Sequence, residues 1–156
     1  IGSTRHIEID LNGTDLQYDT ADNLAVLPEN DGGAVKTLCS LMGYDANEHF
    51  TIEPTAKDFK YPFPVPCTIK EALGSYFDLF GLPKHSLVSR LVPYVTSDKQ
   101  KAWLTDLVAK HNHSEFKKYI NGNGRSFFDL VTNELDSCKI PFVDLLHILP
   151  RLPDNY

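Results

Sequence analysis

The sequence predicts an α+β protein that is mostly α, in which a short antiparallel sheet at the N-terminus gives way to a long helical segment. Residues 4–11 alternate between apolar and polar side chains, as a half-buried strand does. From residue 31 onward, apolar side chains recur at the spacing of amphipathic helices. The change between the two patterns falls within residues 17–31. A sheet therefore begins, and helices follow before it can resume.

Length and composition indicate one domain with a hydrophobic core. The chain has 156 residues, of which 42% are hydrophobic, and its formal net charge is -6. The negative charge opposes nucleic-acid binding, and the absence of a long apolar run predicts no membrane contact within this segment. The three cysteines are widely spaced, without a Cys-x-x-Cys pair. Neither a disulfide framework nor a zinc finger is expected, and a reducing, cytosol-facing compartment fits.

The first 28 residues are expected to form two or three strands. After the strand at residues 4–11, Asn12 and Gly13 make a tight-turn dipeptide, because both tolerate positive φ. A return strand follows, and a further apolar run at residues 24–27 is closed by Pro28, which cannot donate to a sheet. These strands are too few to close a barrel, so the remaining ones must come from elsewhere.

Helices are expected after this break. Asn30 or Asp31 caps the first, which covers residues 31–42 and ends at Gly43. A short strand is expected at residues 49–53. The later helices are expected to start at the capping boxes Thr68-x-x-Glu71 and Ser97-x-x-Gln100, at the cap Ser114, and over residues 86–95, 126–135 and 142–149. Their apolar side chains, Phe80 and Val143 included, are expected to be buried.

No self-contained active site is apparent from the residues alone. The glycine-rich nucleotide motifs, the His-Glu-x-x-His motif and the Gly-x-Ser-x-Gly elbow are all absent. Residues 121–124, Asn-Gly-Asn-Gly, could bind phosphate, but a plain turn is favoured. His111 and His113 could bind a metal, but a solvated helix end is favoured because no third ligand is apparent. The proline-alternating residues 61–66 favour a rigid connector over an SH3-type ligand.

The break within residues 17–31 also carries a resemblance. Its sequence fits the pattern Tyr-x-x-Gly-Asp-x-x-x-Val-x-Pro-x-Asn at Tyr18, Asp22, Val26, Pro28 and Asn30. The segment resembles the FAD-binding domain of the diflavin reductases, the NADPH–cytochrome P450 reductase family. Residues 4–8, the Pro-Phe-Pro-x-Pro element at 62–66 and residues 149–156 are similar to further parts of that domain.

One position departs from the family pattern. Ala21 stands where the family usually has glycine. The substitution implies a turn that tolerates a Cβ atom at this position in this chain.

The resemblance implies a fold in which a helical connecting domain is inserted into a partial antiparallel β-barrel, a flavodoxin-reductase-like FAD-binding domain. Residues 1–28 correspond to the N-terminal strands of the barrel. Residues 29–150 correspond to the connecting domain, and residues 151–156 to the start of the FAD-binding motif strand.

The resemblance also implies a function for the parent protein, an enzyme that passes electrons from NADPH to FAD, then to FMN and to a haem-type acceptor. This piece would position the FMN and FAD domains and bind FAD at most partially, without activity of its own. Its implied partners are the FMN domain, the rest of the FAD/NADPH module and a haem protein. The implied location is the cytoplasm, or the cytosolic face of the endoplasmic reticulum if an N-terminal anchor precedes it. The alternative is a non-enzymatic helical protein-interaction module, which should complete its own sheet.

Four residues are implied to lie near the flavin. His6 matches a histidine near the flavin, and Arg125 matches an arginine associated with FAD binding, for which an ordinary surface arginine is the alternative. Tyr156 matches the first aromatic residue of the flavin motif. Asn155 stands where relatives usually carry a phosphate-binding arginine, so this position has lost a charge.

Overall fold

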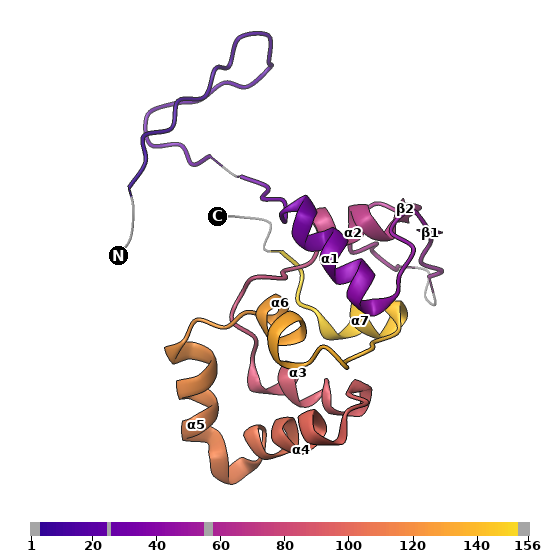
Figure 1. Ribbon diagram of the computed structural model, residues 1–156. Coiled ribbons are helices and arrows are strands. Elements are labelled where there is room, and N and C mark those ends of the chain that lie inside the picture. Colours follow the sequence, from indigo (N-terminus) through magenta and orange to yellow (C-terminus); the bar gives the residue numbers. More distant parts are fainter. Residues whose placement is uncertain (1–3, 25, 55–57, 153–156) are drawn as a thin grey trace.

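The helices pack into one body, from which the N-terminal segment projects (Figure 1). The computed structural model describes residues 4–24, 26–54 and 58–152. A two-stranded antiparallel sheet lies at one end of the body, with His49 opposite Thr68 and Phe50 opposite Cys67. The elements in chain order are α1 (Gly32–Met42), β1 (His49–Phe50), β2 (Cys67–Thr68), α2 (Ile69–Ser75), α3 (His85–Ser89), η1 (Val92–Tyr94), α4 (Asp98–Leu107), η2 (Lys110–Asn112), α5 (His113–Lys117), η3 (Lys118–Gly122), α6 (Phe127–Asp129), η4 (Leu130–Glu134) and α7 (Phe142–Ile148).

The caps expected for α1 and α2 are confirmed. The carboxylate of Asp31 accepts a hydrogen bond from the Ala34 N–H at 2.9 Å, and Gly43 ends α1 in the left-handed region at φ 80°. Thr68 and Glu71 form a reciprocal capping box at the start of α2. The boundaries of these two helices therefore follow from local side-chain chemistry.

The helices at the far end of the body start where expected but are shorter or differently capped. Ser97 caps α4, whereas the Gln100 side chain does not return to it and instead donates to Asp136 at 2.6 Å. The expected cap at Ser114 is wrong, because α5 begins one residue earlier, at His113, without a side-chain cap. The helix expected over residues 86–95 is divided into α3 and η1, because Pro93 lacks the N–H that a continuous helix needs.

Two π-helical turns lie near the glycine-containing residues 121–124: η3 ends within them, at Gly122, and η4 follows α6. The helix expected over residues 126–135 starts with three α-helical residues, α6, and continues as the π-helical η4. Before the loop, α5 passes into the π-helical η3. The loop itself is a turn, in which the Gly124 N–H donates to the Asn121 carbonyl at 3.3 Å and the Arg125 N–H to the Ile120 carbonyl at 2.9 Å. The plain turn expected over residues 121–124 is found only at Asn123 and Gly124, because Asn121 and Gly122 end η3.

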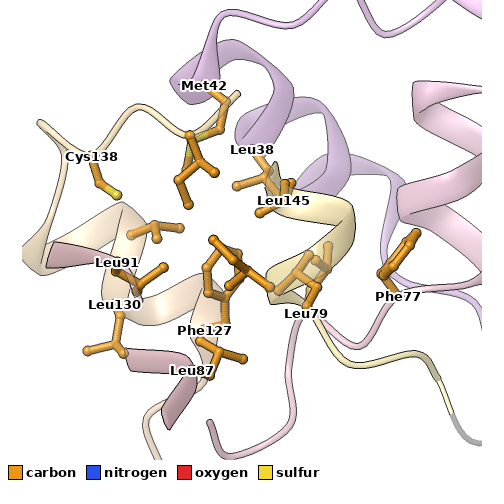
Figure 2. Close-up of a cluster of buried hydrophobic side chains, with 14 of the residues drawn as sticks. Leu38, Met42, Phe77, Leu79, Leu87, Leu91, Phe127, Leu130, Cys138 and Leu145 are labelled. Atoms are coloured by element: carbon orange, nitrogen blue, oxygen red, sulfur yellow. The ribbon is translucent and has the colours of Figure 1, made fainter. Parts of the chain in front are cut away.

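One hydrophobic core joins α1, α2 and α7 to α3, α4, α5, α6 and η4. Figure 2 shows part of this core. Leu38, Leu79, Leu130 and Leu145 are all completely buried within it. Cys39, expected in the core, is buried. Burial of this kind is the main stabilising contribution to the body.

Two side chains that were expected in the core are exposed. Phe80 is 46% exposed, because α2 ends at Ser75 and the chain beyond it is no longer helical. Val143 is 65% exposed, because α7 turns Leu145 and Ile148 toward the core. Both errors concern the outer edge of an otherwise correct apolar face.

The prediction of strands within residues 4–28 is wrong for the described part of that segment, which contains none. The turn between them does form, since Gly13 has φ 79° and the Thr14 N–H donates to the Leu11 carbonyl at 3.1 Å. The flanking residues form no ladder, because a hairpin is marginal in water without further strands to pair with. The apolar side chains that alternate along the segment are exposed, at Ile7, Ile9, Leu16, Tyr18, Leu24 and Val26.

Candidate functional site

The C-terminal turn of α2 receives the chain as it enters the helical body. Residues 26–31, the incoming segment, are tied to α2 by Asn30. The Asn30 N–H donates to the Gly74 carbonyl at 2.7 Å, and its side-chain amide donates to the Leu73 and Phe77 carbonyls, each at 2.6 Å. Carbonyls at a helix C-terminus lack partners within the helix, so Asn30 satisfies groups that would otherwise be unpaired.

The same turn holds the chain as it leaves the body. Residues 150–152, the outgoing segment, form an antiparallel bridge in which Arg151 faces Phe77. The Leu152 N–H donates to the Tyr76 carbonyl at 3.0 Å, and the Asp78 N–H donates to the Pro150 carbonyl at 2.9 Å. Residues 76–78 therefore contact both segments, which are far apart in the sequence and approach the same side of the body (Figure 1).

Hollows flank this junction. A cavity of about 420 Å³ is lined by residues that include Pro28, Pro62, Tyr76 and Arg151. The Arg151 Nη1 donates to the Pro62 carbonyl at 3.0 Å, which ties the proline-rich connector to the outgoing segment. Tyr76 stacks on Phe63 with ring centroids 5.0 Å apart. The expected role of residues 61–66 as a connector is consistent with these contacts.

Arg125 lies in a separate cluster between the two π-helical turns. Its Nη1 lies 2.6 Å from the Glu134 Oε1, and its guanidinium carbon lies 4.8 Å from the centre of the Tyr119 ring. The Arg125 Nε is buried and has no hydrogen-bond partner among the described residues. Burial, and then the hydrogen bond and charge of Glu134, raise the pKa of Tyr119 to about 12. Trp103 packs edge-on against Tyr119, with ring centroids 5.4 Å apart.

The residues implied by the resemblance are not assembled into one site within the described part of the chain. His6 is exposed on the projecting segment and its Nε2 lies 3.0 Å from the Glu8 Oε1. Asn155 and Tyr156 lie outside the described residues. The Arg125 guanidinium is engaged by Glu134 and Tyr119. The described residues therefore do not by themselves fit a flavin.

Each of the two histidines considered for a metal site has a different neighbour within the described residues. His111 is 4.0 Å from the Asp106 carboxylate, and the His113 ring centre is 6.3 Å from that of His85. Within residues 4–24, 26–54 and 58–152, no group of three His, Cys, Asp or Glu side chains could hold a metal ion. The same part of the chain contains no helix with the length and apolar character needed to cross a membrane.

Sequence reasoning missed the junction at residues 76–78. It considered Asn30 as a possible helix cap and as a position of the family pattern, although the adjacent Asp31 can supply that cap alone. Two neighbouring residues with capping side chains are a signal that one of them has another partner. The partners of Asn30 lie more than 40 positions away, at separations of 43 and 47 residues, so no local pattern identifies them.

Comparison with known proteins gives one consistent family. The profile of the family described as "FAD binding domain" matches residues 3–156. The chain is similar to the NADPH–cytochrome P450 reductase of Musca domestica, with 28% identity over 99% of this chain and 23% of the relative. It is also similar to that of Saccharomyces cerevisiae, with 29% identity over 97% and 22% of the two chains. The NADPH-dependent diflavin oxidoreductase 1 of Danio rerio has 26% identity over 95% and 25%. The chain thus spans about a quarter of the length of these relatives.

Proposed function

Since this chain belongs to the FAD-binding domain family, we propose that it is a segment of an NADPH-dependent diflavin oxidoreductase. The names of its relatives supply the rest of the proposal, because they include reductases of cytochrome P450 and a diflavin oxidoreductase. In the parent enzyme, electrons pass from NADPH to FAD, then to FMN and to a haem-type acceptor. The flavins supply this redox chemistry when bound, and the protein supplies their position.

The role of this segment is to set the position of the FMN domain relative to the FAD domain. Residues 29–150 act as a helical connecting domain inserted into a flavodoxin-reductase-like β-barrel. In the parent, residues 1–28 would form the first barrel strands once the remaining strands pair with them, and residues 151–156 would begin the strand that carries the flavin motif. The observation that carries this proposal is the junction, where the incoming and outgoing segments both bind residues 76–78, directly after α2. An insertion into a sheet requires its two ends to be close together, as they are here.

The uncovered apolar side chains of the N-terminal segment support the same proposal. Ile7 is 76% exposed and Leu27 is 77% exposed, although strand residues of this kind are normally buried on one face. A free-standing interaction module would complete its own sheet, so the alternative of a non-enzymatic helical module is disfavoured. In the parent, these side chains would pack against the remaining barrel strands.

We propose that His6, Asn155 and Tyr156 lie on the flavin side of the junction. For Arg125, a flavin pyrophosphate would share with Glu134 a guanidinium whose Nη1 already binds that carboxylate. The proposed acceptor is a haem protein, and the proposed location is the cytoplasm or the cytosolic face of the endoplasmic reticulum.

The test compares the full-length parent with the 156-residue chain. The purified parent should contain FAD and FMN and should reduce cytochrome c with NADPH. The 156-residue chain should show negligible reduction under the same conditions. A parent without either flavin, or without NADPH-dependent reduction of cytochrome c, would contradict the proposal.

A further inference from the structure

We infer that Asn30 is a positioning residue that holds the incoming and outgoing segments in one fixed arrangement, and thereby sets the alignment of the two flavin-bearing domains. The inference rests on the proposed function. Asn30 makes three hydrogen bonds to carbonyls at and just after the C-terminal end of α2, those of Leu73, Gly74 and Phe77, at 2.6 to 2.7 Å. Both donor hydrogens of its side-chain amide are used, so the side chain has one orientation that satisfies the turn.

The turn couples the two segments through adjacent peptide groups. The Phe77 carbonyl accepts from the Asn30 side chain, while the neighbouring Tyr76 carbonyl accepts from the Leu152 N–H. The next N–H, that of Asp78, donates to Pro150. A displacement of residues 76–78 therefore moves both the incoming and the outgoing segment.

The turn cannot readily shift within the body. The Asp78 Oδ1 accepts from the Phe80 and Gly81 N–H groups, at 3.1 and 2.7 Å, and closes the following loop. A Cβ atom at Gly81 would lie 2.0 Å from the Asp78 Oδ2, so a larger residue there would displace the Asp78 carboxylate. Phe77 is 3% exposed and Leu79 is completely buried (Figure 2). The core thus holds the turn in place, and Asn30 transfers that rigidity to the incoming segment.

A purely structural asparagine would affect stability alone, whereas a positioning residue affects electron transfer between domains. The two roles separate when two acceptors are compared. Ferricyanide is a small, diffusible oxidant that can take electrons before they cross to the second flavin. Cytochrome c, in the proposed function, receives electrons only after that crossing.

The experiment uses the full-length parent with Asn30→Ala and, from the outgoing side, Leu152→Pro, which removes the N–H that binds Tyr76. The matched control is Asn123→Ala, because the Asn123 side chain also donates to a carbonyl at a helix end, that of Tyr119 at 3.2 Å, but away from the junction. NADPH-dependent reduction of both acceptors, flavin content and melting temperature are measured for each variant.

Both junction variants should lose roughly tenfold in cytochrome c reduction with ferricyanide reduction within about twofold of wild type, because small misplacements strongly reduce rates. In Asn123→Ala, the ratio of cytochrome c reduction to ferricyanide reduction should equal that of wild type. An unchanged ratio in Asn30→Ala, or an equal loss with both acceptors together with flavin loss, refutes the positioning role. Wild-type parent that fails to reduce cytochrome c refutes the proposed function, and with it the inference.

Discussion

Ala21 adopts a backbone conformation that glycine would adopt at lower cost. Its φ is 76°, in the turn closed by the Asp22 N–H and the Asp19 carbonyl at 3.1 Å. The left-handed region costs an L-residue roughly 1–2 kcal/mol, so Ala21→Gly should raise the population of this turn. NMR couplings and the temperature dependence of the Asp22 amide shift measure that population. The expectation from sequence that this turn tolerates a Cβ atom is confirmed.

The other turn of the same segment offers the matched control for Ala21. Gly13 has φ 79°, so Gly13→Ala should lower the population of its own turn. Neither substitution should change the melting temperature of the body, since both residues are exposed and lie outside it. A change in melting temperature for either variant would contradict this separation.

Tyr119 makes the stability of the body depend on pH in the alkaline range. Its pKa is raised to about 12, chiefly by burial and then by Glu134, whereas a tyrosine in the unfolded chain ionises near pH 10. The folded state keeps its proton over this interval and the unfolded state releases it, so the free energy of unfolding falls as the pH rises from about 10 to about 12. Tyr119→Phe should make this fall shallower in urea titrations at several pH values.

Tyr119→Phe should reduce the dependence of the free energy of unfolding on pH without abolishing it. Burial also raises the pKa of Tyr44, so Tyr44 contributes to the same dependence. Tyr18→Phe is the control, since the Tyr18 ring is 75% exposed on the projecting segment. The two variants should differ in slope. Equal slopes would mean that Tyr119 remains accessible to hydroxide in the folded body.

The helices show which features of an element can be predicted locally. Asp31, Thr68 and Ser97 lie within a few residues of the N–H groups they cap, so sequence alone locates these helix starts. The π-helical turns η3 and η4 were not predicted, because they depend on where Ile120 and Leu130 meet the core. Gln100 likewise leaves its own helix for Asp136, which no capping rule anticipates.

The capping box of α6 provides a test at low pH. Hydrogen bonds from the Ser126 side chain, and then from its backbone, lower the pKa of Asp129. Such a group stabilises the fold above the pKa it has when unfolded, and that contribution is lost as the pH falls through its lower folded value. Asp129→Asn should therefore cost about 1 kcal/mol at neutral pH and give a shallower loss of stability below pH ~4.

The control for Asp129→Asn lies in the first turn of α4. Asp98 is acidic and exposed there, but the cap of that helix is Ser97. Asp98→Asn should change the free energy of unfolding by only a few tenths of a kcal/mol at neutral pH, as expected for a screened surface charge near a helix start. Acid titrations followed by circular dichroism compare the two variants. The prediction for Asp129 is wrong if both lose stability in parallel.

At the scale of the whole molecule, sequence patterns predict local features but miss contacts between distant parts of the chain. Alternation correctly marks Ile7 and Ile9 as one apolar face, but a strand needs a partner, and none of the described residues pairs with this segment. The junction is non-local too, because Asn30 and Arg151 meet only through residues 76–78. Arg125 shows the reverse case: the resemblance marks it, while its contacts with Glu134 and Tyr119 depend on how η3 and η4 fold.

The helical body should fold without the N-terminal segment. Among the described residues, none before Val35 is buried in its core, and the incoming segment is held from Asn30 onward. Deletion of residues 1–27 should therefore leave the melting temperature nearly unchanged. It should also abolish most binding of a dye specific for exposed apolar surface and most self-association, because the exposed side chains of the segment are removed. Static light scattering and dye fluorescence measure self-association and dye binding.

The control for this deletion is Val143→Thr, at the exposed apolar side chain of α7, which should reduce dye binding only slightly. A deletion variant that unfolds would show instead that the segment stabilises the body, and one that still associates would assign the association to the body itself.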